Sequence, residues 1–231
     1  VPVLLLRSLA ACWSGDLLGA EEDLRSSEID LASGISTTSS YRAGLLADLL
    51  VERGEVEEAG RILHSVRSDD QVHAGYRPFY LYAGARLRLA RGEVEEALAA
   101  FRAVGDFMAR VGIANPAYVP WRSQAALSLC ALGRDDEARE LATEELELAR
   151  KWGAMRSIGV ALRTLGLVQR GAEGEELLGE AVNALAESPA RLEHARALVD
   201  LGASLRRRNQ RADARELLRQ GLNFAHRAGA V

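Results

Sequence analysis

A recurring pair of small residues constrains the fold of this chain more than any other feature of the sequence. A turn glycine is followed five residues later by an alanine in each of four similar strings, SGDLLGAEEDL, RGEVEEAGRIL, RGEVEEALAAF and LGRDDEARELA. The glycines are Gly15, Gly54, Gly92 and Gly133, and the alanines are Ala20, Ala59, Ala97 and Ala138. A motif that recurs at a nearly constant interval along the sequence is typical of a stacked repeat protein. Proteins of this kind bind partners along an extended surface.

The segments on either side of each glycine predict helices. Leu46, Leu49 and Leu50 precede Gly54 with the i, i+3, i+4 spacing of an apolar helical face. The glycine would end the first helix in a left-handed conformation, which costs glycine little. Acidic residues follow each glycine, where they suit the positive end of a helix dipole. The alanine would lie inside the second helix and allow the two helices to approach closely.

Two further units follow the pattern less closely. In the last unit Asn209 replaces the glycine and Ala214 holds the alanine place. In the fifth unit the turn cannot be assigned to one residue within 171–174, and Leu178 falls where the alanine is expected. We therefore predict about six helical hairpins in one array over residues 1–231, and we expect this array to be a fragment of a longer protein.

The repeat length bears on the class of helical repeat. Successive turn positions are separated by 39, 38, 41, 40 and 36 residues. Tetratricopeptide units have about 34 residues and HEAT units about 40 to 47. The order of a Leu-Gly pair, the turn glycine and the alanine along each unit favours the tetratricopeptide pattern over HEAT. The predicted fold is an all-α, right-handed superhelical solenoid of antiparallel helical hairpins that is tetratricopeptide-like.

Composition and charge exclude several classes of protein. The formal net charge of −4 argues against a general nucleic-acid-binding surface, which is usually basic. The longest apolar run, residues 1–6, is far too short to span a bilayer. Cys12 and Cys130 lie far apart and form no CxxC pair, which fits a reducing cytoplasm. We expect a cytoplasmic chain that contacts neither membrane nor nucleic acid directly.

The sequence contains no motif for catalysis, metal binding or nucleotide binding. It has no GxxxxGK[ST], HExxH or GxSxG string, and Lys151 is its sole lysine. No convergent set of nucleophile, base and oxyanion donors can be assembled from it. The chain is therefore predicted to be a binding protein without a cofactor, a metal or an enzymatic activity of its own.

The candidate binding surface is the concave side, which the first helix of each hairpin would line. The predicted groove residues are Tyr41, Asp48, Phe79, Tyr82, Arg86 and Arg163. Aromatic and arginine side chains are favoured at binding hot spots. The alternative for the aromatic residues is packing between helices. A basic cluster at residues 206–208 and Arg211 is either a docking patch or a solvated helix end.

Three strings carry a resemblance to a known family: ARLRLARGEVEEALAAF, NPAYVPWRSQAALSLCALGRDDEARELATEELELARKWGA and SPARLEHARALVDLGASLRRRNQRADARELLRQGLNFAHRAGA. They resemble the helical-repeat region of large LuxR-type ATP-binding transcriptional regulators of the maltose-regulon-activator type. The resemblance implies an ATPase module before the repeats and a helix-turn-helix after them, so that ATP is expected only in a missing N-terminal module.

Under that resemblance the repeats would bind a protein or small-molecule inducer in the concave groove and pass the signal to the flanking modules, and self-association is possible. The alternative is a stand-alone tetratricopeptide adaptor that docks peptides or proteins without a role in transcription.

Overall fold

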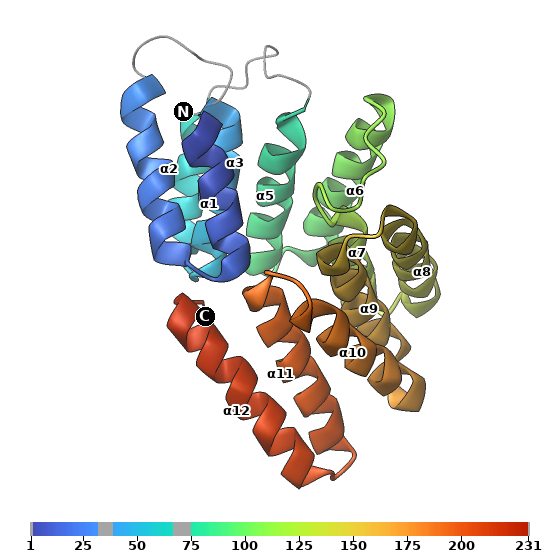
Figure 1. Cartoon of the computed structure of the whole chain (residues 1–231). Coiled ribbons are helices and arrows are strands. Elements are labelled where there is room, and N and C mark those ends of the chain that lie inside the picture. The colour runs from blue at the N-terminus through green and yellow to red at the C-terminus, as the bar shows by residue number, and fades with distance from the viewer. Residues whose placement is uncertain (1, 32–38, 67–74, 231) are drawn as a thin grey trace. The chain divides into compact units, whose positions relative to one another are not determined.

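The computed structural model describes residues 2–31, 39–66 and 75–230, and within these ranges it contains twelve helices and no strand (Figure 1). The helices are α1 (Pro2–Ser14), α2 (Leu17–Leu31), α3 (Ser39–Glu52), α4 (Val56–Ser65), α5 (Arg77–Ala90), α6 (Val94–Arg110), α7 (Trp121–Ala131), α8 (Asp135–Trp152), α9 (Met155–Gln169), α10 (Gly171–Ala186), α11 (Arg191–Arg207) and α12 (Arg211–Ala228). None of these helices is both long enough and apolar enough to cross a membrane.

The helices fall into two compact units. Unit 1 holds most of α1 together with α2 to α6, and unit 2 holds α7 to α12. Three helices that each begin a hairpin, α5, α9 and α11, pack against both helices of the preceding hairpin. In unit 1, α5 contacts α3 and α4, and in unit 2, α9 contacts α7 and α8, and α11 contacts α9 and α10. This packing stacks the hairpins of a repeat protein on one another. A single array over the whole chain stays a prediction.

The turns within the hairpins confirm the role predicted for the glycines. Gly54 and Gly92 have φ values of 74° and 80°, and Asn209, in the glycine position of the last unit, has a φ of 65°. The residue after each of them donates its N–H to a carbonyl five residues back, for example Glu93 to Arg88 at 3.0 Å. This bond is part of the Schellman motif, in which a left-handed residue closes a helix. It recurs in every hairpin turn except that between α9 and α10.

The alanines that follow the turns are buried where the two helices of each hairpin meet. Ala20, Ala59, Ala97 and Ala138 are fully buried, and Ala214 is 2% exposed. Acidic side chains lie in the first turn of α4, α6 and α8, as the sequence predicts. The hairpins α3–α4, α5–α6 and α7–α8 therefore share a left-handed turn residue, an acidic first turn and a buried alanine.

The fifth hairpin departs from this pattern at its turn. Helix α10 begins at Gly171, one residue after Arg170, and both residues have positive φ values, of 63° and 56°. The backbones of α9 and α10 meet at Gly166 and Gly174, where a Cβ added to Gly174 would lie 2.5 Å from the Gly166 carbonyl oxygen. Gly174 therefore occupies the small-residue place in this hairpin. The assignment of that place to Leu178 was wrong.

The sixth hairpin shows why the assignment failed. There Gly202 faces Ala214 and Leu218, just as Gly166 faces Gly174 and Leu178 in the fifth hairpin. Eight residues separate the small pair in the fifth hairpin, whereas twelve separate it in the sixth. The fifth turn is therefore four residues shorter than the sixth. Counting five residues from the predicted turn passes Gly174 and reaches Leu178 instead.

Candidate functional site

The adjacent first helices of unit 1, α3 and α5, carry five of the six predicted groove residues, and they pair Asp48 with Arg86 and Tyr41 with Phe79. Asp48 and Arg86 hold equivalent places in successive repeats. Nη1 of Arg86 donates hydrogen bonds to Oδ1 of Asp48 at 2.8 Å and to Oε1 of Glu52 at 2.5 Å. The side chains are 17% exposed for Arg86, 34% for Asp48 and 13% for Glu52, so all three are partly buried. We call this trio the α3–α5 ionic seam.

The two carboxylates of the α3–α5 ionic seam stabilise the positive charge of Arg86. Burial alone would lower the pKa of the Arg86 guanidinium, but Asp48 and Glu52 outweigh burial and hold this pKa well above its ordinary value. The same carboxylates act on α1, because burial and then Asp48 and Glu52 raise the pKa of the Cys12 thiol to about 12. The seam thus presents one permanent cation between two acidic side chains.

The aromatic residues of unit 1 pack against one another. Tyr41 stacks on Tyr76 with ring centroids 4.6 Å apart and meets Phe79 edge-on at 4.8 Å. Tyr82 meets Phe101 at 5.7 Å. Tyr41 is 5% exposed and Tyr82 is 6% exposed, so both rings belong to the core of unit 1. Contact between these rings and a partner stays a prediction.

The sixth predicted residue, Arg163, lies in unit 2 and forms a similar link between first helices. Its Nε donates to Oδ2 of Asp200 at 2.5 Å and thereby joins α9 to α11. Arg163 is 15% exposed and Asp200 is 23% exposed. Asp200 and Glu52 are not among the groove residues predicted from the sequence. Both were within reach of the repeat pattern, since Asp200 follows Arg163 by 37 residues and Glu52 follows Asp48 by one helical turn.

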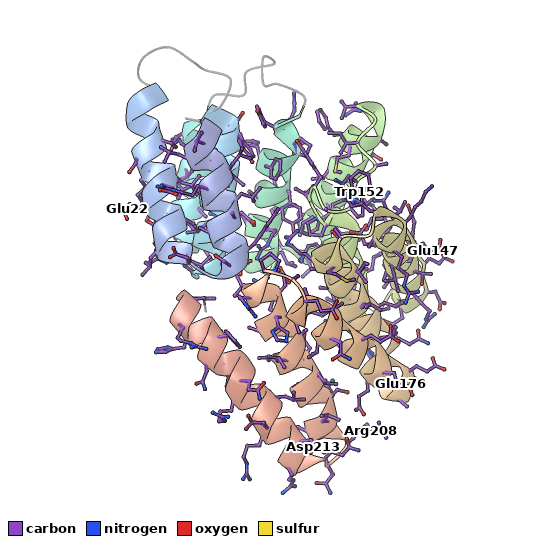
Figure 2. All side chains as sticks on the ribbon, viewed as in Figure 1. Glu22, Glu147, Trp152, Glu176, Arg208 and Asp213 are labelled. Atoms are coloured by element: carbon purple, nitrogen blue, oxygen red, sulfur yellow. The ribbon has the colours of Figure 1, made fainter. Side chains whose placement is uncertain are left out.

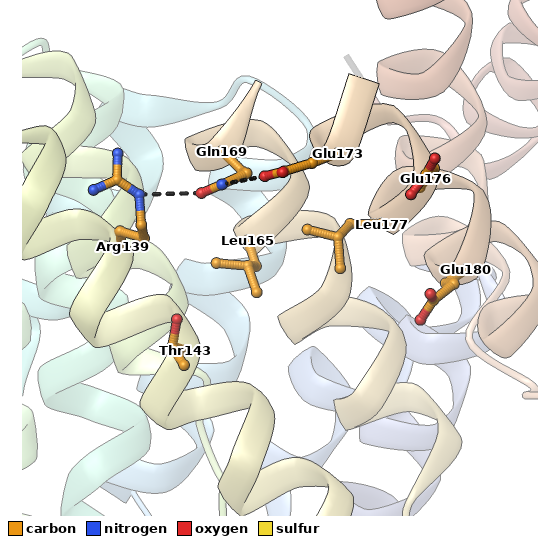
Figure 3. A pocket seen from close by; sticks show the side chains of 8 residues that line it. All are labelled: Arg139, Thr143, Leu165, Gln169, Glu173, Glu176, Leu177 and Glu180. Atoms are coloured by element: carbon orange, nitrogen blue, oxygen red, sulfur yellow. Dashed lines mark hydrogen bonds between the residues drawn. The ribbon is translucent and has the colours of Figure 1, made fainter. Parts of the chain in front are cut away.

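The second helices form a different surface, and each unit has a groove there. In unit 1 a groove of about 830 Å³ lies between α4 and α6 and is floored by α5, with Leu63, Ala99 and Ala103 in its walls. In unit 2 a groove of about 450 Å³ lies between α8 and α10 and is floored by α9 (Figure 3). The two grooves occupy equivalent places in the repeat, and neither was predicted from the sequence.

Unit 2 also contains a buried carboxyl group. Glu145 of α8 is 2% exposed, and its Oε2 lies 3.6 Å from Nη1 of Arg122, beyond hydrogen-bond distance. Nε of Arg122 instead donates to Glu144 at 2.9 Å. Burial raises the pKa of Glu145 to about 7, although the positive charge of Arg122 acts in the opposite direction. Among the described residues, no group of three or more His, Cys, Asp or Glu side chains could hold a metal ion.

Comparison with known proteins identifies the fold. No family model matches the chain, and no curated protein sequence matches it either. Among solved structures, it is similar to BtubC (BKLC) from P. vanneervenii, with a TM-score of 0.61 and 14% identity over 96% of this chain and 91% of that one.

Two further structures are similar over nearly the whole chain. The apo quorum sensor NprR from B. thuringiensis has a TM-score of 0.55 and 13% identity, covering 97% of this chain and 76% of that one. A Rap protein complexed with Competence and Sporulation Factor has a TM-score of 0.52 and 13% identity, covering 98% and 76%. At such identities the likeness shows the fold alone. The chain is an all-α, tetratricopeptide-like helical repeat.

Proposed function

We propose that this chain is the partner-binding repeat segment of a transcriptional regulator. A protein, a peptide or a small-molecule inducer would lie along the first helices, and the chemistry would belong to ATPase and DNA-binding modules outside residues 1–231. Two observations support a binding role: the helical-repeat fold, and the similarity to a Rap protein whose structure holds Competence and Sporulation Factor.

The α3–α5 ionic seam is the observation that carries this proposal. Ion pairs that are partly buried stabilise a fold little compared with apolar residues of the same size. The same groups give a polar partner fixed donors and acceptors, and they contribute more to specificity than to raw affinity. Arg86 lies between Asp48 and Glu52 on the face that first helices present in a repeat array. We assign this seam to partner recognition.

Signalling would follow from differential affinity. A ligand changes the balance of two conformations only when it binds one of them more tightly than the other. The residues of the seam come from two helices, α3 and α5, so a ligand that contacts both would favour one arrangement of consecutive hairpins. Flanking modules would respond to that arrangement.

Peptide selection tests the binding role. A displayed library of random peptides is selected on the wild-type chain, and the recovered peptides are measured by fluorescence anisotropy against Arg86→Gln and Arg219→Gln. Arg219 is an exposed arginine of α12 that pairs with Glu216 through the ordinary i, i+3 spacing, so it controls for loss of charge. We expect Arg86→Gln to weaken binding by roughly tenfold and Arg219→Gln to leave it unchanged. Equal binding to both variants would remove the seam from the proposed function.

The regulator role has a separate test. The full reading frame should carry a phosphate-loop motif before residue 1 and a helix-turn-helix after residue 231. A reading frame without both modules would favour the stand-alone adaptor.

A further inference from the structure

The groove between α8 and α10 in unit 2 has an apolar floor. Leu165 of α9 and Leu177 of α10 line it and pack from the groove side against the buried core of this unit (Figure 3). Both leucines are only partly buried. A volume of about 450 Å³ accommodates a few side chains of a partner and lies within the usual range for ligand sites.

Polar bridges cross the groove near both ends. Near the turn, Nε of Arg139 donates to Gln169 at 3.0 Å, and Nε2 of Gln169 donates to Glu173 at 2.6 Å. Farther along, Arg150 of α8 and Glu180 of α10 lie 3.7 Å apart. These links connect α8 to α10 and set the spacing between the walls of the groove. The apolar floor is therefore open between two fixed polar ends.

The rim of the groove is acidic. Glu173, Glu176 and Glu180 follow one another along α10 at i, i+3 and i+7, and Arg139 is the one cation among the eight lining residues. Arg139 is already bonded to Asp136 at 2.8 Å. Glu176 is exposed (Figure 2), and within the described part of the chain it makes no hydrogen bond or ion pair with another residue. The groove thus combines an acidic rim, in which Glu176 has no partner among the described residues, with an apolar floor.

We infer that the α8–α10 groove binds a short basic segment of a protein partner, in which arginine or lysine side chains flank a leucine-sized apolar residue. The apolar residue would cover Leu165 and Leu177, and the cations would pair with Glu176 and its neighbours on α10. An amphipathic helix laid in a groove is a common form of peptide recognition. This surface is separate from the first-helix face, so the inference does not depend on the α3–α5 ionic seam.

A designed peptide provides the test. Its arginines repeat the i, i+3, i+7 spacing of the three glutamates around one leucine in an alanine background, and a fluorophore at one end reports binding by anisotropy. The protein is the full chain as wild type, Glu176→Arg, Glu22→Arg and Arg86→Gln. Glu22 is an exposed glutamate on α2 of unit 1 (Figure 2) and does not line the groove, so Glu22→Arg makes the same change of charge outside the proposed site.

The expected result is selective loss in one variant. Glu176→Arg replaces an attraction with a repulsion and should weaken binding by roughly tenfold or more, whereas Glu22→Arg should stay within about twofold of wild type. Replacing the central leucine of the peptide by serine should also weaken binding. Arg86→Gln should bind like wild type, which separates this groove from the proposed first-helix site.

Three results would overturn the inference. Equal weakening by Glu176→Arg and Glu22→Arg would show that the peptide responds to the overall charge of the protein and has no specific site in this groove. Full binding by Glu176→Arg would place the peptide elsewhere. Concentration-dependent self-association in sedimentation, abolished by Glu176→Arg without any peptide, would make the occupant a second copy of this chain, for which the exposed Arg206 and Arg207 supply the basic side chains.

Discussion

Replacing Glu145 by glutamine should stabilise unit 2 at alkaline pH and leave its stability unchanged at acidic pH. Burial raises the pKa of Glu145 from 4.5 to about 7 in the folded chain. Between these two values the folded state keeps a proton that the unfolded state has lost. The free energy of unfolding therefore falls as pH rises through this window and levels off above it.

The size of the effect follows from the gap between the two pKa values. Each pKa unit corresponds to about 1.4 kcal/mol, so ionised Glu145 costs the folded state about 3 kcal/mol once the pH exceeds 7. Glutamine keeps the shape and polarity of the side chain but never ionises. Arg122 keeps its other partners in the variant, because it still donates to Glu144 at 2.9 Å and lies over the Trp121 ring at 4.5 Å.

Urea denaturation followed by circular dichroism measures the prediction. Wild type, Glu145→Gln and the control Glu147→Gln are unfolded at several pH values from about 4 to about 9, a range that spans both pKa values. Glu147 lies on the same helix and is exposed (Figure 2). We expect Glu145→Gln to match wild type at the acidic end and to exceed it by about 3 kcal/mol at the alkaline end. A difference that is constant across the pH range, or one that Glu147→Gln reproduces, would refute the reasoning.

Three further predictions concern the turns, the close helix contact and the cysteine of unit 1. Gly174→Ala should lower the free energy of unfolding by about 1–3 kcal/mol in urea titrations, because its Cβ would lie 2.5 Å from the Gly166 carbonyl oxygen; Gly179→Ala, where a Cβ meets nothing within 4 Å, should be neutral or stabilising. Gly92→Val should cost about 1–2 kcal/mol through backbone strain alone, since φ is +80° and the space around it is open; an unchanged melting temperature would contradict this. Cys12, with its pKa raised to about 12, should react with a thiol reagent at neutral pH about a thousandfold more slowly in the folded chain than in urea, and equal rates would contradict its burial.

The hairpins were predictable from sequence because their signals are local. A left-handed glycine, an acidic first turn and a buried alanine all fall within a few residues, and Asn209 could be recognised as a substitute because asparagine also tolerates positive φ. Gly174 was missed for a physical reason. The fifth turn is four residues shorter than the sixth, so its small residue lies closer to the turn than the fixed interval of five residues predicts. The shortening becomes visible only when the residues that face each other across the two helices are known.

The site residues were harder to predict because their environment is tertiary. Asp48 and Arg86 could be paired in retrospect, since equal places in successive repeats lie side by side. Glu145 could not be told apart from the other glutamates of the same acidic helix, because its burial depends on how α7 and its neighbours cover it. The two outer grooves depend on how far apart consecutive second helices lie, which no single repeat encodes.

The shortened fifth turn shows that a hairpin can change in length while the packing between its two helices stays the same. When both antiparallel helices are shortened equally at the turn, the same positions still face each other. Gly166 faces Gly174 in the fifth hairpin as Gly202 faces Ala214 in the sixth. Hairpin tips are thus the natural points for insertion and deletion as such arrays diverge. An engineer could attach a fluorophore to the exposed side chain of residue Gln210 at the tip of α11 and α12, which leaves the hydrogen bond from Arg208 to Glu175 in place.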